Sequence, residues 1–306
     1  MCGSTEHGVL LVAEDTLHHL PGRWTVRRCV RCGHGFTSPR PDRSSIRRYY
    51  PDDYQPFSSP VRTDPGRRRF SRTRELASRL LDPREVVLPG VDPGDALEVG
   101  CGSGRVLADL ARRGWRVRGL EPSAAAAGRA TAAAGVPVDH GTVEGAVFPD
   151  QSLDLVLTLM VLEHLHDPLT QARRIAGWLR PGGHLSGSVP NAGSWELRAF
   201  GPAWFALQVP THLQHFTPGS LSRLLTSAGF ERPRIVHQRN VSNLVVQLGW
   251  VLRRRGWPGG KLCLAYPERG SRVMRLALWP LAFSLAALKQ AGRISFIARR
   301  AADRLS

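Results

Sequence analysis

Apolar residues in this chain fall into short runs that end at glycine or proline, and the clearest series begins near residue 93. The run at 95–99 follows Pro93-Gly94 and leads into the glycine-rich segment 100–104. Residues 105–111 then show the apolar spacing of a helix. This order predicts a strand, a tight turn and a helix, which is how a nucleotide-binding α/β sheet opens.

More elements of the same kind are expected further along the chain. Apolar runs predict strands at 115–120, 135–138, 232–238 and 293–299, and the alanine-rich stretch 124–134 predicts a helix. Because strands and helices alternate, we predict an α/β sheet. The apolar run 276–288 is interrupted by Pro280 and is shorter than the about 20 residues of a membrane-spanning helix.

The glycine segment discriminates between two kinds of nucleotide ligand. The dinucleotide fingerprint G-x-G-x-x-G would require glycine where Arg105 or Leu107 stands, so it does not match. The pattern present is Glu98 followed by glycines at 100, 102 and 104. A carboxylate at this strand end repels a pyrophosphate and favours a cationic amino group, and Glu121, at the end of the next strand, suits ribose hydroxyls. The expected ligand is an amino acid joined to a nucleoside.

Four further segments follow in a fixed order. They are an apolar strand with an acidic lead-in at 149–157, a segment at 160–168 that contains Leu162-Glu163-His164, Leu-Arg-Pro-Gly-Gly-His-Leu at 179–185, and Val-Pro-Asn at 189–191. With the glycine segment, they make residues 93–233 resemble the class I S-adenosylmethionine-dependent methyltransferases. The segment at 162–164 is similar to that of ubiquinone-biosynthesis O-methyltransferases. The resemblance implies an α/β fold with a doubly wound, Rossmann-like sheet, whose fourth strand and lead-in lie at 149–157 and whose turn into the fifth strand lies at 179–185. It also implies a methyltransferase with S-adenosylmethionine as its cofactor.

The resemblance also implies which residues contact the cofactor. These are Glu98, Gly100, Cys101, Gly102, Gly104, Glu121, Thr142, Val143, Glu144 and Met160. The family commonly places an acidic residue against the adenine amino group, and this chain has Thr142 at the position of the usual aspartate, so Glu144 or the backbone near Val143 would supply the contact. Met160 stands where ubiquinone-type relatives have the first acidic ligand of a divalent ion, which argues against a catalytic metal.

Three histidines are candidates for the base that removes the proton of an acceptor hydroxyl. Methyl transfer from a sulfonium is an in-line displacement, and histidine titrates in the useful range. His164 follows the fourth strand, at the edge where ligands of α/β sheets bind. His212 and His215 follow the aromatic stretch 195–205, which suits an acceptor pocket, and His212 is favoured as substrate-facing. Alternatively, His164 caps a helix or packs without a catalytic role, and His215 is an ordinary residue before a helix. The tryptophans would then belong to the core instead of an acceptor pocket.

The N-terminal segment carries candidate metal ligands. Cys29-Val30-Arg31-Cys32-Gly33 is a half-site for structural zinc, and Cys2-Gly3 looks like the end of a second half-site. A subgroup of these methyltransferases begins with paired CxxCG knuckles followed by PRP and YY segments, which are present here at 39–41 and 49–50. The expected ligands are Cys2, Cys29 and Cys32. A fourth would precede Met1 or be His7 or His34, unless the site has decayed to free thiols.

These assignments divide the chain into four parts. We expect a zinc-ribbon-like segment at 1–56, a helical, arginine-rich connector at 57–92, a catalytic domain at 93–239 and 290–306, and a helical insertion at 240–289. The connector would be solvated or would close over the cofactor. The insertion would be a substrate lid, a dimer surface or an interfacial helix pair at a membrane.

The net charge constrains the partners weakly. A formal charge of +17 and a pI near 11.2 favour nucleic acid or an anionic membrane. Yet Lys261 and Lys289 are the only lysines, so the positive charge comes almost wholly from arginine. A coding bias toward arginine codons would produce the same excess of positive charge without any anionic partner. Residues 1–20 lack a signal-peptide pattern, so a reducing cytoplasm without disulfides is expected.

The sequence therefore predicts a methyltransferase that acts on a hydroxyl of a small, sugar-linked or lipid-linked metabolite. A ribosomal-RNA methyltransferase is the alternative, because some carry an N-terminal zinc module and a basic surface. Against it, the strand-four loop has no NPPY-like segment for a flipped base. A third interpretation is a cofactor-binding protein without turnover. Nucleic acid is not expected as a partner, whereas peripheral membrane contact and a homodimer are left open.

Overall fold

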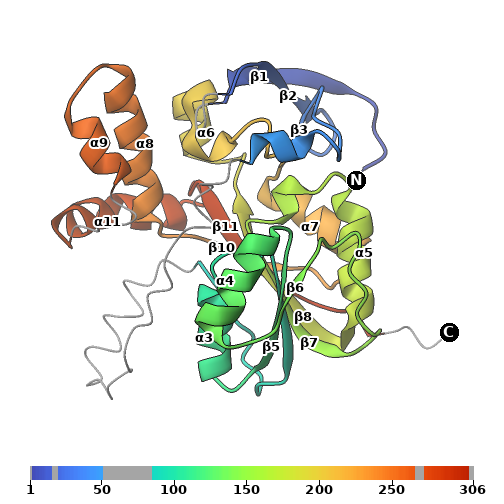
Figure 1. Ribbon diagram of the computed structural model, residues 1–306. Helices are drawn as coiled ribbons and strands as arrows, with labels where there is room; N and C mark the ends of the chain where they lie inside the picture. The colour runs from blue at the N-terminus through green and yellow to red at the C-terminus, as the bar shows by residue number, and fades with distance from the viewer. Residues whose placement is uncertain (1, 16–19, 51–84, 266–271, 303–306) are drawn as a thin grey trace.

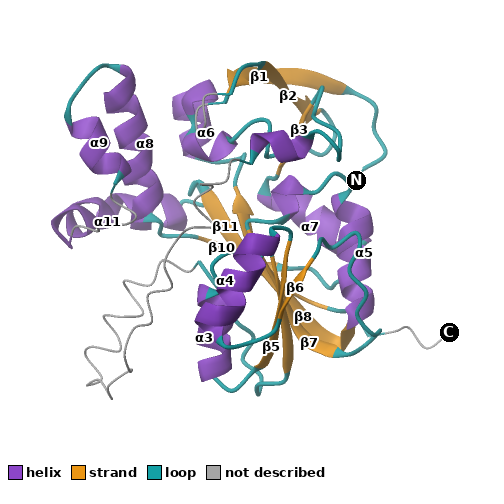
Figure 2. Cartoon of the chain, in the orientation of Figure 1, coloured by secondary structure: helices purple, strands orange, loops and turns teal. Residues whose placement is uncertain are grey.

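The computed structural model describes residues 2–15, 20–50, 85–265 and 272–302 of the 306 (Figure 1). Most of the predicted connector, including its arginine-rich stretch 67–79, lies outside the described residues. The described part contains a seven-stranded sheet with helices on both faces, a four-stranded sheet above one of its edges, and a group of helices to one side (Figure 2).

The larger sheet is the framework of the site. Its strands are β4 (Asp95–Val99), β5 (Arg116–Glu121), β6 (Val138–His140), β7 (Leu153–Leu159), β8 (Leu179–Pro190), β10 (Arg234–His237) and β11 (Arg293–Arg299). Their order is β10-β11-β8-β7-β4-β5-β6, with β4 to β8 parallel and β11 antiparallel between β8 and β10. The predicted doubly wound, Rossmann-like fold is confirmed. The carboxyl ends of its parallel strands share one edge, where ligands of such sheets bind.

Helices cover both faces of this sheet (Figure 1). On one face lie α3 (Arg105–Arg112) and α4 (Ala124–Ala134), and on the other lie α5 (Pro168–Trp178) and α7 (Pro218–Ser227). A strand covered on both sides has to be apolar on both, and β7 accordingly reads Leu-Asp-Leu-Val-Leu-Thr-Leu.

Two strands start later than their apolar pattern predicts, and proline accounts for both. The third strand begins at Val138 because Gly135 ends α4 in a left-handed conformation (φ 68°) and Pro137 has no N–H for the ladder. β10 begins at Arg234, directly after Pro233. The other predicted strands agree with the structure to within two residues.

The N-terminal segment forms the smaller sheet together with a strand from far along the chain. β1 (His7–Glu14), β2 (Arg23–Cys29), β3 (Gly35–Thr37) and β9 (Gln214–His215) are its antiparallel strands. Leu213, just before β9, donates its N–H to Glu163 O at 2.8 Å, directly beyond β7. The smaller sheet is thereby attached to the carboxyl edge of the larger one.

Short helical turns lie beneath the smaller sheet. They are α6 (Trp195–Phe200), η3 (Gly201–Ala203) and η4 (Phe205–Leu207), and η1 (Ile46–Tyr49) follows the N-terminal strands. Apolar residues of β1 and β2 share one core with residues 197–209. The N-terminal segment therefore packs on the region expected to hold the acceptor.

The insertion forms a helical group beside the larger sheet (Figure 2). Its helices are α8 (Val241–Arg254), α9 (Gly259–Leu264) and α11 (Arg272–Ala287). α8 and α9 pack at backbone distance, since a Cβ added to Gly249 would lie 2.9 Å from Cys263 Cβ. Within the described ranges, none of the helices combines the length and hydropathy needed to cross a bilayer.

Candidate active site

The glycine-rich loop between β4 and α3 leaves no space for a side chain at Gly100 or Gly104. Gly100, Gly102 and Gly104 have φ values of 67°, 52° and 77°, a left-handed conformation that other residues disfavour. A Cβ on Gly100 would lie 2.8 Å from Val161 Cγ2, and one on Gly104 would lie 3.1 Å from Ala130 O. A ligand at this edge can therefore approach the backbone at the start of α3 closely.

Glu121 joins this loop to the end of β5. It is 1% exposed, and its Oε2 accepts a hydrogen bond from Gly102 N–H at 2.9 Å while its Oε1 accepts one from Ser123 N–H at 3.0 Å. Burial raises the pKa of Glu121, and these two donors oppose the rise. Each carboxylate oxygen keeps a further lone pair, which suits a pair of ribose hydroxyls.

Glu98 is the second buried acid beside the loop. It is 3% exposed, and its Oε2 has no hydrogen-bond partner among the described residues. Burial raises the pKa of Glu98 to about 8, although the positive charge of Arg105 opposes this change. A buried carboxyl oxygen without a partner is the group that an incoming ammonium ion would satisfy.

The segment after β6 lies against the end of β5. Gly141 donates its N–H to Glu121 O at 3.0 Å. In the turn that follows, Val143 is buried, Glu144 is half-buried and Thr142 is exposed. The residues expected near an adenine ring thus lie at the same edge as the glycine loop.

Cys101 and Met160 are the remaining residues expected around the cofactor. Cys101 is buried within the glycine loop, and this burial raises the pKa of its thiol. Met160 follows β7 in a left-handed conformation (φ 56°) and donates its N–H to Ser188 O at 2.9 Å. Such a conformation is uncommon outside glycine and is concentrated at functional sites.

His164 lies just beyond β7, in the turn η2 (Leu162–His164). Its Nδ1 is 3.0 Å from Thr211 O and 2.8 Å from Tyr50 Oη. Thr211 O can only accept, and it favours the tautomer with the proton on Nδ1, in which Tyr50 Oη is a second acceptor of that proton and Nε2 keeps its lone pair. Burial lowers the pKa of His164 to about 4, so the ring is neutral near pH 7. His164 is therefore oriented as a proton acceptor.

His212 packs against His164 edge to face. The two ring centroids are 4.7 Å apart and the ring planes are 81° apart. His212 is 1% exposed, and its Nδ1 donates to Ala206 O at 3.0 Å. Burial, followed by the neighbouring His164 and His215, holds the pKa of His212 well below its usual range. Of the two stacked rings, His164 is the more accessible.

Glu163 completes this group and was not expected from the sequence. It is fully buried, and neither carboxyl oxygen has a hydrogen-bond partner within the described ranges. Burial raises the pKa of Glu163 to about 8, and the charge of Arg293, at the start of β11, opposes the rise. Ligand atoms of Glu163, His164 and His212 lie within 4.8 Å of one another, close enough to hold a metal ion. Tyr50 was likewise not expected, although both residues lie in motifs that were noted.

His215 lies in the smaller sheet rather than beside His164. Its Nε2 is 3.0 Å from Thr37 Oγ1, whose hydroxyl donates to His212 O at 2.8 Å. The single hydroxyl proton is used in that bond, so His215 donates to Thr37. Burial lowers the pKa of His215 to about 3. His215 thus connects β9 to β3 behind the stacked histidines.

The aromatic stretch 195–205 is divided between core and surface. Trp204 is 1% exposed in the core shared with the N-terminal sheet, and it donates its Nε1 proton to Glu196 at 3.2 Å. Trp195 is 42% exposed and packs edge to face on Phe200, with centroids 5.8 Å apart. Trp204 is therefore a core residue, and Trp195 is the more accessible ring.

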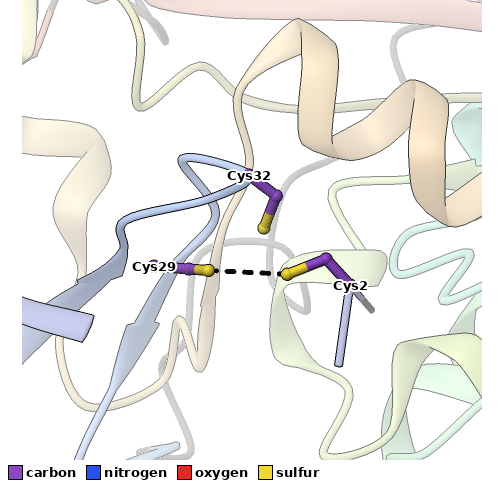
Figure 3. Close-up of side chains that lie close together, drawn as sticks. All are labelled: Cys2, Cys29 and Cys32. Carbon is purple, nitrogen blue, oxygen red and sulfur yellow. Dashed lines mark hydrogen bonds between the residues drawn. The ribbon is translucent and has the colours of Figure 1, made fainter. Parts of the chain in front are cut away.

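The N-terminal cysteines converge on one point, as Figure 3 shows. Ligand atoms of Cys2, Cys29 and Cys32 lie within 4.8 Å of one another, and the sulfurs of Cys2 and Cys29 are 3.5 Å apart. The backbone N–H of Cys32 lowers the pKa of Cys29 to about 7, whereas burial raises the pKa of Cys32 to about 11. The three residues predicted as zinc ligands are brought together.

The two histidines considered as a fourth zinc ligand are engaged elsewhere. His34 Nε2 is 2.9 Å from Gln214 Oε1, and the ring of His7 packs edge to face on Phe36 at 5.3 Å. Among the residues that the structure describes, no fourth cysteine, histidine or acid joins the three thiols. A closed tetrahedral zinc site needs one more ligand.

Comparison with known proteins identifies the family. A family model for a methyltransferase domain matches residues 67–234, more than half of the chain. The chain belongs to this methyltransferase family. The matched residues end at the start of β10 and do not reach the N-terminal cysteines.

Individual relatives agree with the assignment. A protein of Mycolicibacterium smegmatis with the name "Probable S-adenosylmethionine-dependent methyltransferase" is 35% identical over 141 residues, which are 45% of this chain and 52% of that protein. The ubiquinone biosynthesis O-methyltransferase of Methylobacterium nodulans is 30% identical over 210 residues, 63% of this chain and 84% of the relative. The match of this chain spans 52% of the length of the Mycolicibacterium smegmatis protein and 58% of that of a second relative, the ubiquinone biosynthesis O-methyltransferase of Methylobacterium sp..

Among solved structures, the S-adenosylmethionine dependent methyltransferase of Mesorhizobium loti shares 19% sequence identity with this chain at a TM-score of 0.48, and the match covers 74% of this chain and 96% of that one.

The cofactor of the methyltransferase family, S-adenosylmethionine, fits the residues at the glycine loop. Its amino group suits the unpartnered Oε2 of Glu98, and its ribose suits the carboxylate of Glu121. Because the loop glycines have no side chains, a ligand can lie against the backbone of the loop.

Proposed function

We propose that this protein transfers a methyl group from S-adenosylmethionine to a hydroxyl of a small, sugar-linked or lipid-linked metabolite. The observation that carries the proposal is His164, a neutral imidazole whose Nδ1 proton is bound by Thr211 O at the ligand edge of the sheet. The relatives with the name ubiquinone biosynthesis O-methyltransferase support a hydroxyl as the acceptor.

The bound cofactor would supply an electrophilic methyl group on a sulfonium. In this proposal His164 accepts the proton of the acceptor hydroxyl at Nε2 as the hydroxyl oxygen attacks. Thr211 O and the Tyr50 hydroxyl orient the ring, and His212 packs against it. Glu163 is neutral near pH 7 because burial raises its pKa to about 8; in its ionised form it would offset the positive charge that the ring acquires. His215 acts indirectly, through Thr37 and the backbone of His212.

A methyl-transfer assay tests the proposal. Labelled S-adenosylmethionine is incubated with the protein and fractionated host extract, and the labelled fraction is identified. Label in organic-soluble or water-soluble metabolites supports the proposal. Label in RNA would replace it with the ribosomal-RNA alternative and give the +17 charge a function. Cofactor binding without any transfer would indicate a protein without turnover.

A metal-assisted reaction is the alternative that Glu163, His164 and His212 raise. Two histidines and a carboxylate with open positions can bind a divalent first-row ion. Met160, at a position where a further acid would serve, argues for proton transfer without an ion. Turnover that survives EDTA supports the base. Turnover lost to EDTA and restored by Mg²⁺ or Mn²⁺ would assign the group to a metal.

We further propose that Cys2, Cys29 and Cys32 hold a structural zinc ion, which would stabilise the turn between β2 and β3. Zinc per chain is measured for the wild type, for Cys29→Ser/Cys32→Ser, and for Cys263→Ser as a control on a cysteine outside the group. About one equivalent in the wild type and the control, and none in the double variant, supports the site. Less than about a tenth of an equivalent in the wild type excludes it.

We also propose that the insertion contacts an anionic membrane surface. Its exposed apolar side chains are Trp257 (58%), Leu262 (64%), Val273 (76%), Leu276 (64%) and Leu288 (70%). Exposed basic residues at 253–255 and 261 lie beside them, and Glu268 is the one acid in the sequence 240–289. Flotation with phosphatidylglycerol vesicles, lost in Trp257→Ala/Leu262→Ala, supports the contact. A dimer that buries these residues, detected by light scattering, would replace it.

A further inference from the structure

A basic groove lies beside the edge strand β10, away from the glycine loop. It has a volume of about 610 Å³ and is bordered by α7, by the segment from Arg232 into β10, and by Lys289 after α11. Its polar lining comes from Ser222, Arg223, Thr226, Arg232, His237 and Lys289. Three strands separate β10 from β4, so the groove is about 19 Å from the glycine loop across the sheet.

The lining carries positive charge without any carboxylate. Arg223, Arg232 and Lys289 are exposed around the groove, and none of the residues that line it is Asp or Glu. The neighbouring Glu231 lies 3.7 Å from Arg299 instead. His237 adds a ring whose Nδ1 is buried without a hydrogen-bond partner among the described residues. Among the residues that the structure describes, no carboxylate lines the groove to neutralise these positive charges.

α7 contributes polar groups on the same side. Ser222 and Thr226 are one helical turn apart, so both hydroxyls lie on the face that borders the groove. The helix also begins in the groove, at Pro218, and the N-terminal end of a helix is its positive end. Hydroxyl donors and this dipole add to the attraction that the cations exert on an anion.

Lys289 occupies a backbone position that favours glycine. It follows α11 with φ 58°, and the bond from Gln290 N–H to Leu285 O, at 2.7 Å, closes the helix end around it. Lysine is also rare in this chain, with two residues among 42 basic ones. Strained backbone positions outside glycine are concentrated at functional sites, and a ligand for the ammonium group would account for a lysine in this conformation beside a cavity.

We propose that this groove binds the phosphate group of a phosphate ester. Several cations that reach one space from separate segments suit a phosphate, whose oxygens accept hydrogen bonds in several directions and which carries up to two negative charges. Ile235 and Pro233, which also line the groove, would contact the organic part of the ligand. The same phosphate chemistry occurs in soluble metabolites and in lipid headgroups. This site does not depend on the proposed acceptor or on methyl transfer.

Calorimetric titration tests the site with three probes: inorganic phosphate, inorganic pyrophosphate and dihexanoyl phosphatidic acid below its critical micelle concentration. The test variant is Lys289→Gly/Arg232→Gln. Glycine suits the backbone at 289, so the variant is expected to keep its fold, and its Tm is measured alongside. The matched control is Lys261→Gln/Arg254→Gln, which removes the same charge from exposed positions outside the groove.

The wild type is expected to bind pyrophosphate saturably, and the test variant to lose about tenfold or more in affinity, since it loses two charged donors. The control is expected to stay within about twofold of the wild type. Tighter binding of the short-chain lipid than of pyrophosphate, lost in the same variant, assigns the phosphate to a headgroup, and the reverse order assigns it to a soluble ester. Absence of saturable binding by all three probes, or equal losses in variant and control, would overturn the site.

Discussion

The two ends of the ligand edge are built in different ways. At the proposed cofactor end, Glu98, the glycine loop and Glu121 lie within a short stretch of chain, and Gly102 and Glu121 are 19 residues apart. At the proposed acceptor end, His164 is held by Tyr50, 114 residues away, and by Thr211, 47 residues away. The cofactor end is therefore a local motif, whereas the acceptor end exists only after distant segments have packed together.

Both ends nevertheless bury a carboxylic acid with a pKa of about 8. Glu98 leaves one oxygen without a partner beside the glycine loop, and Glu163 leaves both oxygens without one beside two histidines. Burial is the main cause of the raised pKa in each case. The comparison predicts that the first acid serves binding and the second serves turnover.

The largest expected effect is on turnover at the acceptor end. His164→Ala should lower kcat by about 10²- to 10⁴-fold, the usual contribution of a general base, and leave the Kd for S-adenosylmethionine within about twofold. His166→Gln is the control, because the Nε2 of His166 faces Pro41 O, outside the stacked pair. Full turnover in both His164→Ala and His212→Ala would remove base catalysis by these residues.

The next effect is on binding at the cofactor end. Glu121→Ala removes the acceptor of two loop N–H groups and of the ribose, so the Kd for S-adenosylmethionine should rise about 100-fold. At saturating cofactor, kcat should change little. Calorimetry and steady-state kinetics separate the two quantities. An unchanged Kd, or a loss confined to kcat, would contradict the division into two ends.

The pH dependence of stability should reveal both buried acids. The folded protein keeps these protons up to about pH 8, whereas the unfolded chain releases them near pH 4.5, so the free energy of unfolding falls as the pH rises between these values. Glu98→Gln and Glu163→Gln should each raise the free energy of unfolding by about 1–3 kcal/mol at pH 8 and by little at pH 4.

Urea unfolding at pH 4 and pH 8 measures this effect, with the exposed Glu231→Gln as the control. The functional outcome should differ between the two acids: Glu98→Gln weakens cofactor binding, and Glu163→Gln keeps binding and loses turnover. A pH profile of stability that is identical in wild type and variants would refute the raised pKa values.

The smallest expected effects come from helix caps. Ser123 caps α4 at the cofactor end and Thr217 caps α7 at the acceptor end, and each side chain accepts a hydrogen bond from the first turn of its helix. Ser123→Ala and Thr217→Ala should each cost about 1 kcal/mol of stability. Ser123→Ala keeps the backbone N–H that donates to Glu121, so it should weaken cofactor binding only slightly, by loosening the start of α4 that positions this N–H. An effect of Thr217→Ala on cofactor affinity would mean that the ends are coupled.

Much of the fold was predictable because its signals are local. Strand runs, the glycine turn and the alanine-rich helix 124–134 follow from hydrophobic periodicity, and the structure confirms them. The strands begin at Val138 and Arg234, and not at the predicted 135 and 232, because Pro137 and Pro233 cannot donate a hydrogen bond to a ladder.

The candidate site was predictable in part. Glu98, the loop glycines, Glu121 and the three cysteines were named from their spacing, and the other cofactor contacts from the resemblance. The structure joins Glu121 to Gly102 and brings the three cysteines together. Tyr50 and Glu163 were missed because nothing local marks a tyrosine that will meet a histidine 114 residues away, or an acid that will lose all of its partners on burial.

The sequence by itself determined the order of strands and helices, the glycine loop and the acids at its two strand ends, because periodicity and backbone conformation act over a few residues. The tertiary structure alone decided that β9 joins the N-terminal sheet, that His164 faces His212 while His215 does not, and that Arg223, Arg232 and Lys289 surround a groove beside β10. Those arrangements depend on contacts between distant segments, and such contacts form only when burial of the shared core offsets the entropy of bringing the segments together.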